Sequence, residues 1–359
     1  MVSIISIKSQ KLNGSIFVPG DKSISHRALI LGSCALGKTT IENLLESEDV
    51  FSTLAALKEL GVSIKKKNQF WEVQGNGLGS FKDPDKVLDL GNSGTGIRLL
   101  MGLVSGCGIT ASFTGDISLK SRPMKRVLVP LKQSGAEILS NGYNLPVTIK
   151  GTKTPIPIKY TSSLSSAQVK SCVLLNGLTS TGKTLYNEAT KSRDHTEKML
   201  HHMGAEVYSK KLKNGTNKIE LKGLPDLRGK HFEIPNDPSS AAFPAAAALI
   251  IPDSEIVIKN VCLNDLRIGF YKSIQEMGGF IKFKNKKIIS GELVGDIQVK
   301  YSKLKGIVVP EKRVPSMIDE FPIFCIVACF AKGKTIMTGI EDLRNKESDR
   351  IKEMVNNLK

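Results

Sequence analysis

The chain has 359 residues, of which 40% are apolar and 24% charged, an ordinary balance for a globular enzyme with room for two hydrophobic cores. No apolar run reaches the roughly 20 residues of a membrane-spanning helix, and the N-terminus lacks the pattern of a signal peptide. The formal net charge of +17 suggests an anionic partner, but lysines without a basic block supply most of it, and aromatic residues make up only 6%. We therefore expect a cytoplasmic protein that binds a small anionic substrate, and neither nucleic acid nor a membrane.

Cysteine usage gives no sign of a disulfide framework or a metal centre. The cysteines lie mostly within apolar, helix-like runs, and Cys325 and Cys329 have no histidine near them in the sequence. Free thiols buried in a reducing compartment are expected, and a metal site is not.

The stretch GSCALGKT, residues 32–39, matches the complete P-loop pattern G-x-x-x-x-G-K-T. A P-loop needs a strand before it and a helix after it, because its amides must lie at a helix N-terminus to hold phosphates. Here the preceding KSISHRALIL has the pattern of a helix and the following TIENLLE that of a strand. Gly-Lys-Thr also recurs at residues 182–184 and 333–335, each time between an apolar run and a strand-like segment. These features predict a structural turn between helix and strand rather than a nucleotide site.

One layout recurs five times along the chain. Each copy has an apolar helix, a break at glycine or proline, a strand, a polar loop, an amphipathic helix and a further strand. The first breaks fall at Gly37, Gly108, Gly182, Pro252 and Gly333, and the second helices end at Gly61, Gly135, Gly204 and Gly278. Self-similarity at intervals of 69 to 81 residues predicts an α/β (α+β) fold of repeated units, with helices packed against sheets.

The fifth copy stops inside its second helix, at residues 347–359, where the other copies continue to a glycine and a closing strand. Five copies are also an uneven number for a pair of similar domains. We therefore expect the chain to be truncated by roughly one further unit.

Two polar segments in the first third of the chain are candidates for ligand binding. PGDKSISHRALI places Lys22, Ser23 and Arg27 at the start of a helix, where backbone donors and two cations facing one point predict an anion site. In LDLGNSGTGIRLL, Gly94 leaves the backbone bare for a ligand, just before a helix that carries Arg98. The alternatives are an ordinary capped helix and an ordinary glycine-rich turn.

The middle of the chain repeats this arrangement twice. FTGDISLKSRPMKRV presents Arg122 directly before a helix that begins with proline. SLSSAQVKS offers Ser166 and Gln168 at a helix start, as polar donors suited to a phosphate or to hydroxyl groups.

The segment SRDHTEKML has the pattern of a capping box, with Asp194 as the cap and Glu197 three residues later. Arg193, just outside this helix, is the candidate for ligand contact. His195 is expected to be an exposed residue of the first turn.

The last two polar segments carry acidic residues. VPSMIDEFPIF places Asp319 and Glu320 at the start of a buried helix, where a carboxylate can act as a base. LRNKESDRIKEM gathers Lys346, Glu347 and Arg350, and the last two are expected to share a helix face. A solvated charged surface is the alternative for this segment.

These segments together resemble the 5-enolpyruvylshikimate-3-phosphate (EPSP) synthase family over essentially the whole chain. The matching stretches are PGDKSISHRALI, GNSGTGIRLLMG, FTGDISLKSRPM, SSAQVKS, SRDHTEKML, NDPSSAAFPAAAALI, MIDEFPI and LRNKESDRI. The resemblance implies two domains of three βαβαββ-type units each, with the active site between them. The first domain would span residues 20–236, and the second residues 1–19 and 237–359. The family's sixth unit, with an arginine and a lysine that help to bind phosphoenolpyruvate, has no counterpart in this sequence.

The resemblance implies transfer of the enolpyruvyl group of phosphoenolpyruvate to the 5-hydroxyl of shikimate 3-phosphate, without a metal or organic cofactor, by a monomer when complete. The residues carried over for shikimate 3-phosphate are Lys22, Ser23, Arg27, Ser166, Gln168, Arg193, Asp319 and Lys346. Those for phosphoenolpyruvate are Lys22, Gly94, Arg122, Gln168, Glu347 and Arg350. Lys22, Asp319 and Glu347 would be catalytic, with Asp319 as the base for the hydroxyl and Glu347 as the proton carrier for the methylene carbon. Gly94 maps to the position where a methyl group crowds glyphosate, which competes with phosphoenolpyruvate.

Two other hypotheses remain open. The sister enzyme that acts on UDP-N-acetylglucosamine shares the fold, but we would expect asparagine after Lys22, where this chain has Ser23. A non-enzymatic protein that binds anions or nucleic acid is the second alternative, and nucleic-acid binding that falls steeply with salt would support it.

Overall fold

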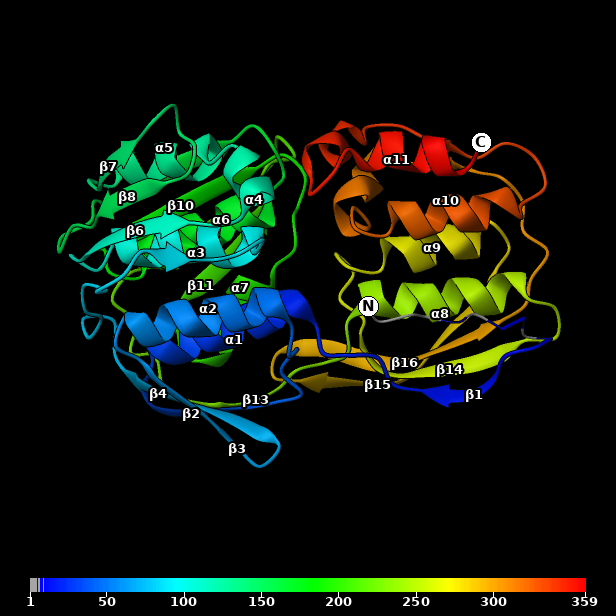
Figure 1. Cartoon of the computed structure of the whole chain (residues 1–359), viewed down its shortest axis with the longest axis horizontal. Coiled ribbons are helices and arrows are strands. Elements are labelled where there is room, and N and C mark those ends of the chain that lie inside the picture. The colour runs from blue at the N-terminus through cyan, green and yellow to red at the C-terminus, as the bar shows by residue number, and fades with distance from the viewer. Residues whose placement is uncertain (1–4, 6, 9) are drawn as a thin grey trace.

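The computed structural model describes residues 5, 7–8 and 10–359. Its buried apolar side chains form two hydrophobic cores, one built by residues between Ile24 and Ile234 together with Cys262, the other by residues between Ala241 and Leu343. We call the two parts of the chain around these cores the first and second lobes. Figure 1 shows them side by side, with α1 to α7 in the first lobe and α8 to α11 in the second. None of the described helices is both long and apolar enough to span a bilayer.

The apolar helix of each predicted repeat forms in the expected place and lies inside its lobe. In chain order these helices are α1 (Lys22–Cys34), α3 (Gly94–Ser105), α6 (Ala167–Gly177), α8 (Pro238–Ile250) and α10 (Phe321–Cys329). They contact one another as well as the sheets, as α3 does with α6 and α8 with α10. Contact on several sides buries most of α1, α3, α6 and α8, whereas in α10 only Phe321, Phe324 and Val327 are buried.

The second helix of each repeat is amphipathic; in the first four repeats it contacts the sheet of its own repeat, whereas the last, α11, contacts α10. These helices are α2 (Glu48–Glu59), α5 (Lys125–Gln133), α7 (His195–His202), α9 (Gly269–Glu276) and α11 (Arg350–Asn357). The first four end just before a glycine with φ between 86° and 103°. Glycine adopts this left-handed conformation without a steric penalty, so it stops each helix at the residue that the sequence predicts.

Four sheets share one strand order: a leading strand, a parallel neighbour, and then an antiparallel hairpin. The parallel neighbours, each following an apolar helix, are β2 (Leu36–Glu42), β6 (Thr110–Thr114), β10 (Lys183–Glu188) and β14 (Glu255–Cys262). The hairpins are β3 (Ser63–Lys67) with β4 (Phe70–Asn76), β7 (Glu137–Ser140) with β8 (Val147–Lys150), β11 (Val207–Lys211) with β12 (Asn217–Lys222), and β15 (Phe280–Ile289) with β16 (Glu292–Lys300). Leading strands β5 (Leu88–Asp89) and β9 (Lys159–Ser162) belong to the middle two sheets.

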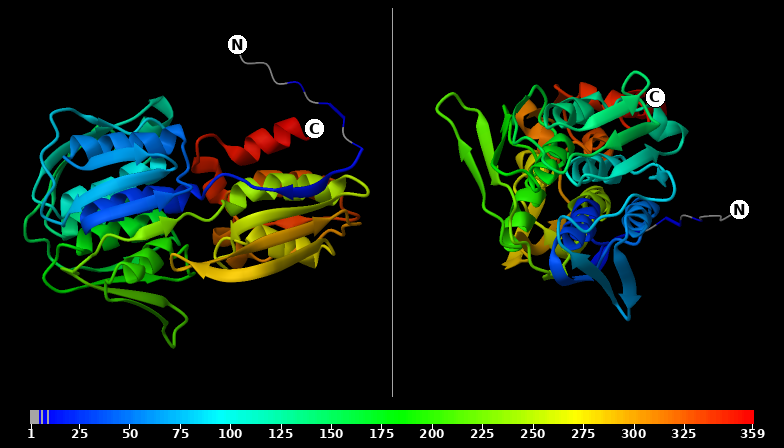
Figure 2. Two further views of the ribbon diagram at one scale, coloured as in Figure 1. Left: turned by 90° about the horizontal axis from the view of Figure 1, so that it is seen from below. Right: turned by 90° about the vertical axis from the view of Figure 1, so that its left-hand side faces the viewer.

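The outer two sheets exchange their leading strands. β1 (Asn13–Ile16) precedes α1 in the chain but pairs with β14 of the second lobe. β13 (His231–Glu233) precedes α8 but pairs with β2 of the first lobe. The chain therefore passes between the lobes twice, just after each of these strands, and Figure 2 shows both connections at one place.

The two connecting segments run antiparallel at Gly20 and Asn236. The amide of Asp21 donates to the carbonyl of Pro235, and the amide of Asp237 donates to that of Pro19, at 2.8 and 2.9 Å. A Cβ atom at Gly20 would lie 2.1 Å from the carbonyl oxygen of Asn43, so this close approach requires glycine.

The fifth repeat is smaller than the others in the described residues. β17 (Val308–Val309) and β18 (Ile336–Met337) form a two-stranded parallel sheet on either side of α10 in the chain. The 3₁₀ helices η1 (Glu311–Ser316) and η2 (Glu341–Asn345) fill the loops, and a short extra helix, α4 (Ile117–Ser121), lies in the second repeat.

The P-loop pattern is structural, as predicted. α1 ends at Cys34, and Gly37, Lys38 and Thr39 lie within β2, so the order is helix and then strand. One detail differs, because these residues belong to the strand itself rather than to the turn. The ammonium of Lys38 is exposed and pairs with Glu72 at 3.3 Å on the neighbouring strand.

Candidate active site

The predicted ligand-binding residues gather at the junction of the lobes because the apolar helices begin there. Lys22 and Gly94 are the first residues of α1 and α3, Ser166 is the N-cap of α6, and Glu320 is the N-cap of α10. Side-chain contacts link these helix ends, from α1 to α6 and α7, from α3 to α6, and from Arg193, just before α7, to Asp319, just before α10. Helix N-termini carry partial positive charge and unpaired amides, so their convergence favours anionic ligands.

Asp319 joins the lobes through arginine. Its Oδ2 accepts from Nη2 of Arg193 at 2.6 Å, and its Oδ1 lies 3.5 Å from Nη1 of Arg350. Burial raises the pKa of Asp319, but the charges of Arg193 and Lys346 outweigh it and hold this pKa well below the usual range. Asp319 is therefore a carboxylate at neutral pH, as a base must be.

Glu347 forms a second link between the lobes. Its Oε2 accepts from Nη2 of Arg350 at 2.6 Å, and its Oε1 lies 3.4 Å from Nη1 of Arg122. Burial alone would raise the pKa of Glu347, but a hydrogen bond from its own amide and the charge of Arg350 lower it. The expectation that Glu347 and Arg350 share a helix face is wrong, because Asp349 caps α11 and Glu347 lies before it; the two residues still pair.

The cations at the start of α1 have separate surroundings. The ammonium of Lys22 is about half exposed and pairs with Asp49 at 3.0 Å. The guanidinium of Arg27 is buried and donates to three neutral oxygens, on Ser23, Ser171 and Thr196, at 2.7 to 2.8 Å. The two cations therefore have different partners in this structure. Burial lowers the pKa of Arg27 to about 10, so a nearby anion would stabilise its charged form.

Two further arginines, Arg98 of α3 and Arg122 after α4, lie close to Gly94 at the start of α3. A Cβ atom at Gly94 would lie 2.9 Å from Nη1 of Arg98 and 3.0 Å from Nη1 of Arg122. Arg98 donates to Gln168 at 3.2 Å, and Gln168 in turn donates to Thr95 at 3.0 Å. Burial, followed by the charge of Arg122, lowers the pKa of Arg98 to about 10. Glycine at position 94 thus keeps space open beside two cations.

Two predictions for the segment around α7 are wrong. Asp194 is the N-cap residue, but its carboxylate accepts no hydrogen bond from the helix amides; it accepts from Asn264 at 2.8 Å and pairs with Lys191 and Lys198. His195 is fully buried, and its Nδ1 lies 2.7 Å from the carboxylate of Glu292. Contacts with the second lobe replace the local cap and cover the histidine.

Lys346 lies on the second lobe beside the first. Its ammonium pairs with Asp342 at 2.9 Å, and the same carboxylate is 3.3 Å from Arg126 of the first lobe. Asp342 is therefore a third carboxylate of the second lobe that meets an arginine of the first.

Some charged residues of this region are missing from the set that the sequence predicts. Lys170 is fully buried in α6 and pairs with Glu188 and Glu197 at 3.1 and 2.8 Å. Arg98 and Lys170 share one signal that could have identified them: each is the single charged residue of an otherwise uncharged helix. Such a charge is tolerated in a core only with polar partners or a ligand.

Glu320 has an unusual protonation equilibrium. It is 1% exposed, and burial, followed by the negative charge of Asp319, raises its pKa to about 7. The folded chain then binds a proton more tightly than the unfolded chain, whose value is 4.5, so folding stability falls as pH rises through 4.5 to 7.

Substituting Glu320→Gln should remove this loss. We compare the free energy of unfolding of the unsubstituted chain with that of the variant. The difference, unsubstituted chain minus variant, should be roughly 2–3 kcal/mol lower at pH 8 than at pH 5. Urea unfolding of both proteins at the two pH values measures this difference, since all other groups titrate alike in both. A difference that does not depend on pH would show that Glu320 is ionised in the folded protein.

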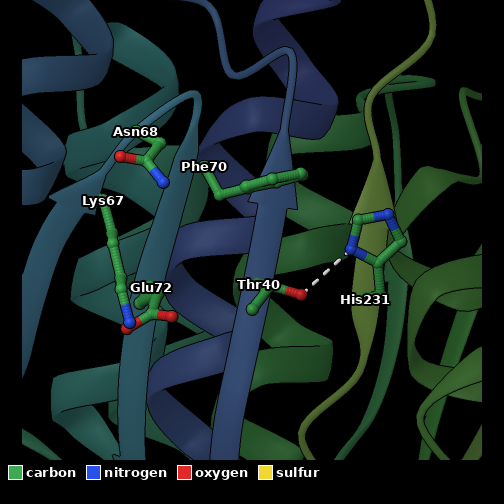
Figure 3. A pocket seen from close by; sticks show the side chains of 6 residues that line it. All are labelled: Thr40, Lys67, Asn68, Phe70, Glu72 and His231. Atoms are coloured by element: carbon green, nitrogen blue, oxygen red, sulfur yellow. Dashed lines mark hydrogen bonds between the residues drawn. The ribbon is translucent and has the colours of Figure 1, made fainter.

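A surface hollow elsewhere in the first lobe contains none of the predicted residues. Figure 3 shows it over the sheet of β2, β4 and β13. Its lining residues are Thr40, Lys67, Asn68, Phe70, Glu72 and His231. Thr40 and His231 hydrogen-bond to each other at 3.0 Å, so their polar atoms are already paired.

Two lobes of repeated α/β units that meet through pairs of arginines and carboxylates define an enzyme that acts on small anions. The family model of EPSP synthase (3-phosphoshikimate 1-carboxyvinyltransferase) matches residues 7–359, and the chain belongs to this family. It is 50% identical to the 3-phosphoshikimate 1-carboxyvinyltransferase of Rhodopseudomonas palustris (strain BisA53) over 347 residues, 96% of this chain and 78% of that protein. It is 49% identical to the enzyme of Bartonella henselae over 359 residues, which is 81% of that protein. A solved structure of EPSP synthase from Acinetobacter baumannii superposes with a TM-score of 0.86 at 41% identity, covering 98% of this chain and 79% of the other.

Proposed function

We infer that the chain catalyses the reaction of its family, transfer of the enolpyruvyl group of phosphoenolpyruvate to the 5-hydroxyl of shikimate 3-phosphate with release of phosphate. The observation that carries this inference is the pairing of Asp319 and Glu347, from the second lobe, with Arg193 and Arg122, from the first. One site then offers carboxylates for proton transfer and cations for two phosphate groups. This combination suits a reaction in which both substrates are anions.

We propose that the two substrates lie in neighbouring parts of this site. The set for shikimate 3-phosphate is Lys22, Ser23, Arg27, Ser166, Gln168, Arg193, Asp319 and Lys346. The set for phosphoenolpyruvate is Lys22, Gly94, Arg122, Gln168, Glu347 and Arg350. Arg98 donates to Gln168, and its guanidinium lies beside Gly94. Both contacts support adding Arg98 to the set for phosphoenolpyruvate.

The proposed chemistry uses the two carboxylates in turn. Asp319 accepts the proton of the 5-hydroxyl as its oxygen bonds to C2 of phosphoenolpyruvate. Phosphoenolpyruvate that pairs with Arg122 and Arg350 would weaken their hold on Glu347 and favour its acid form, which gives a proton to C3. The resulting tetrahedral intermediate loses phosphate, which leaves with the proton held by Asp319. At the same time C3 returns a proton to Glu347, and the double bond is restored. A substrate phosphate that pairs with Arg193 would weaken the hold of that arginine on Asp319 and make Asp319 a stronger base.

We also propose the domain boundaries that the sequence suggests, residues 20–236 for one domain and 1–19 with 237–359 for the other. The separate hydrophobic cores and the antiparallel contact of Gly20 with Asn236 support this division. A monomer is proposed as the functional form.

Phosphate release by the purified chain tests the function. We expect release to require both shikimate 3-phosphate and phosphoenolpyruvate, and calorimetric titration to show binding of shikimate 3-phosphate alone. Replacing shikimate 3-phosphate by UDP-N-acetylglucosamine distinguishes the sister activity. Release with UDP-N-acetylglucosamine and none with shikimate 3-phosphate would contradict the proposal.

Substituting Gly94→Ala should affect the phosphoenolpyruvate part of the site. The new methyl group would force the guanidinium groups of Arg98 and Arg122 apart, because it would lie 2.9 and 3.0 Å from them. We expect the KM for phosphoenolpyruvate to rise and inhibition by glyphosate to weaken by a larger factor. Gly79→Ala is the matched control, since a Cβ there meets no atom within 4 Å. Equal or opposite shifts of the two affinities would argue against this placement of Gly94.

A further inference from the structure

Arg267 holds both segments that connect the lobes. It lies in the loop between β14 and α9, is 2% exposed, and belongs to the second lobe. Its Nη1 donates to Asp21 at 2.5 Å, and its Nη2 donates to Asp237 at 2.9 Å. These two aspartates directly follow Gly20 and Asn236, where the connecting segments pair with each other. One guanidinium therefore binds both connecting segments directly after the point where they pair with each other.

Each of these aspartates also organises the start of an apolar helix. Asp21 is the N-cap of α1 and accepts from the amide of Ile24 at 2.9 Å. Asp237 is the N-cap of α8, accepts from the amide of Ser239 at 2.7 Å, and accepts from the amide of Lys22 at 3.1 Å. A capping carboxylate held by a buried arginine sets the direction in which its helix begins. Arg267 thus determines the position of the peptide that carries Lys22.

A third branch leads from Arg267 toward Asp319. Nη2 of Arg267 donates to the hydroxyl of Ser239 at 3.0 Å, and this hydroxyl donates to the carboxylate of Glu320. Glu320 is the N-cap residue of α10 and follows Asp319 directly in the chain. The same guanidinium is therefore linked to two helix starts. One, in the first lobe, carries Lys22, the proposed phosphate ligand, and the other, in the second lobe, carries Asp319, the proposed base.

The charges at this junction depend on the guanidinium. Burial would raise the pKa of Asp21, but Arg267 and then His195 lower it. Burial and the neighbouring charge of Asp21 raise the pKa of Asp237. Without a bridging cation, two buried carboxylates would repel each other at the point where the lobes are joined.

We propose that Arg267 is a positioning residue for the reaction, one that sets the start of α1 with Lys22 against the start of α10 with Asp319. This proposal rests on the proposed function, because it assigns Lys22 and Asp319 to one substrate. Arg267 touches neither substrate set directly and acts through Asp21, Asp237 and Ser239. A lysine carries its three donors on one nitrogen, so it could neutralise one aspartate but lacks the planar fork whose two nitrogens reach Asp21 on one side and Asp237 with Ser239 on the other.

Two variants separate positioning from simple stabilisation. In Arg267→Lys, we expect the Kd for shikimate 3-phosphate to rise at least tenfold and hydrogen exchange of the amides of Lys22 and Ile24 to accelerate at least tenfold. In Ser239→Ala, which breaks only the branch to Glu320, we expect phosphate release to fall about tenfold with the Kd changed less than threefold. Arg267→Met serves as a harsher variant, but it risks misfolding and is not needed for the conclusion.

Arg313→Met is the matched control. Arg313 also lies in the second lobe and makes a two-pronged ion pair, with Glu276 at 2.5 and 2.6 Å, but it contacts neither connecting segment. We expect this variant to lose thermal stability without the changes in binding or in exchange at Lys22 and Ile24.

The proposal is overturned if Arg267→Lys is folded and both its Kd and its exchange at these amides stay within twofold of the unsubstituted chain. It is also overturned if Arg313→Met and Arg267→Lys shift both quantities alike. If the unsubstituted chain does not bind shikimate 3-phosphate, the proposed function fails, while hydrogen exchange still tests the role of Arg267.

Discussion

Replacing Asp319 by asparagine should lower the rate of phosphate release by about 10²- to 10⁴-fold, the range that a positioned base contributes. The amide keeps the size of the side chain and can still accept from Arg193, which now donates to Asp319 at 2.6 Å. It cannot take the proton of the 5-hydroxyl. We therefore expect the Kd for shikimate 3-phosphate, measured by calorimetry, to change less than about tenfold while turnover is lost.

Asp265→Asn is the control for this substitution. Asp265 is an exposed aspartate of the same lobe whose carboxylate pairs with Lys272 at 2.9 Å on the surface. Its loss should leave both turnover and binding unchanged. If Asp319→Asn keeps more than about a tenth of the turnover, another group must be the base.

The second large effect is expected from Lys22→Ala, compared with Lys38→Ala. Lys22 begins α1 at the junction of the lobes, whereas Lys38 is an exposed residue of β2, within the P-loop pattern. Losing a cation that pairs with a bound phosphate costs about 2–5 kcal/mol, which weakens binding by roughly 30- to 5,000-fold. We expect calorimetry to show binding of shikimate 3-phosphate abolished or nearly so in Lys22→Ala and unchanged within twofold in Lys38→Ala.

Two results would contradict this interpretation of the two lysines. One is ATP binding that depends on Lys38, which would revive the nucleotide site. The other is an equal loss of affinity in both variants, which would indicate a general effect of positive charge rather than a contact. Because Lys38 pairs only with Glu72 on the described surface, its removal should not disturb folding.

Local patterns were sufficient to predict the repeated helices. The apolar and amphipathic helices form where their periodicity indicates, and four of the amphipathic ones stop at a glycine with positive φ. These signals act within a few residues of the chain, so no distant contact is needed to interpret them. The motifs at the helix starts, from Lys22 to Arg350, were also sufficient to indicate the family.

Strand pairing was not determined locally. β1 and β13 have only four and three residues, and each pairs outside the repeat that it precedes in the chain, β1 with β14 and β13 with β2. Strands this short carry little pattern of their own, so their partners depend on how the lobes are assembled. The same contacts between lobes buried His195 and drew Asp194 away from the capping role that its local sequence suggests.

The sequence by itself determined the repeats, the polar helix starts and the identity of the candidate residues. Only the tertiary structure decided which charge meets which. Arg193 and Asp319 are 126 residues apart in the chain, and Asp21 and Arg267 are 246 apart. The strength of such a pair depends on its distance and on its burial, and both are set only when the two lobes come together.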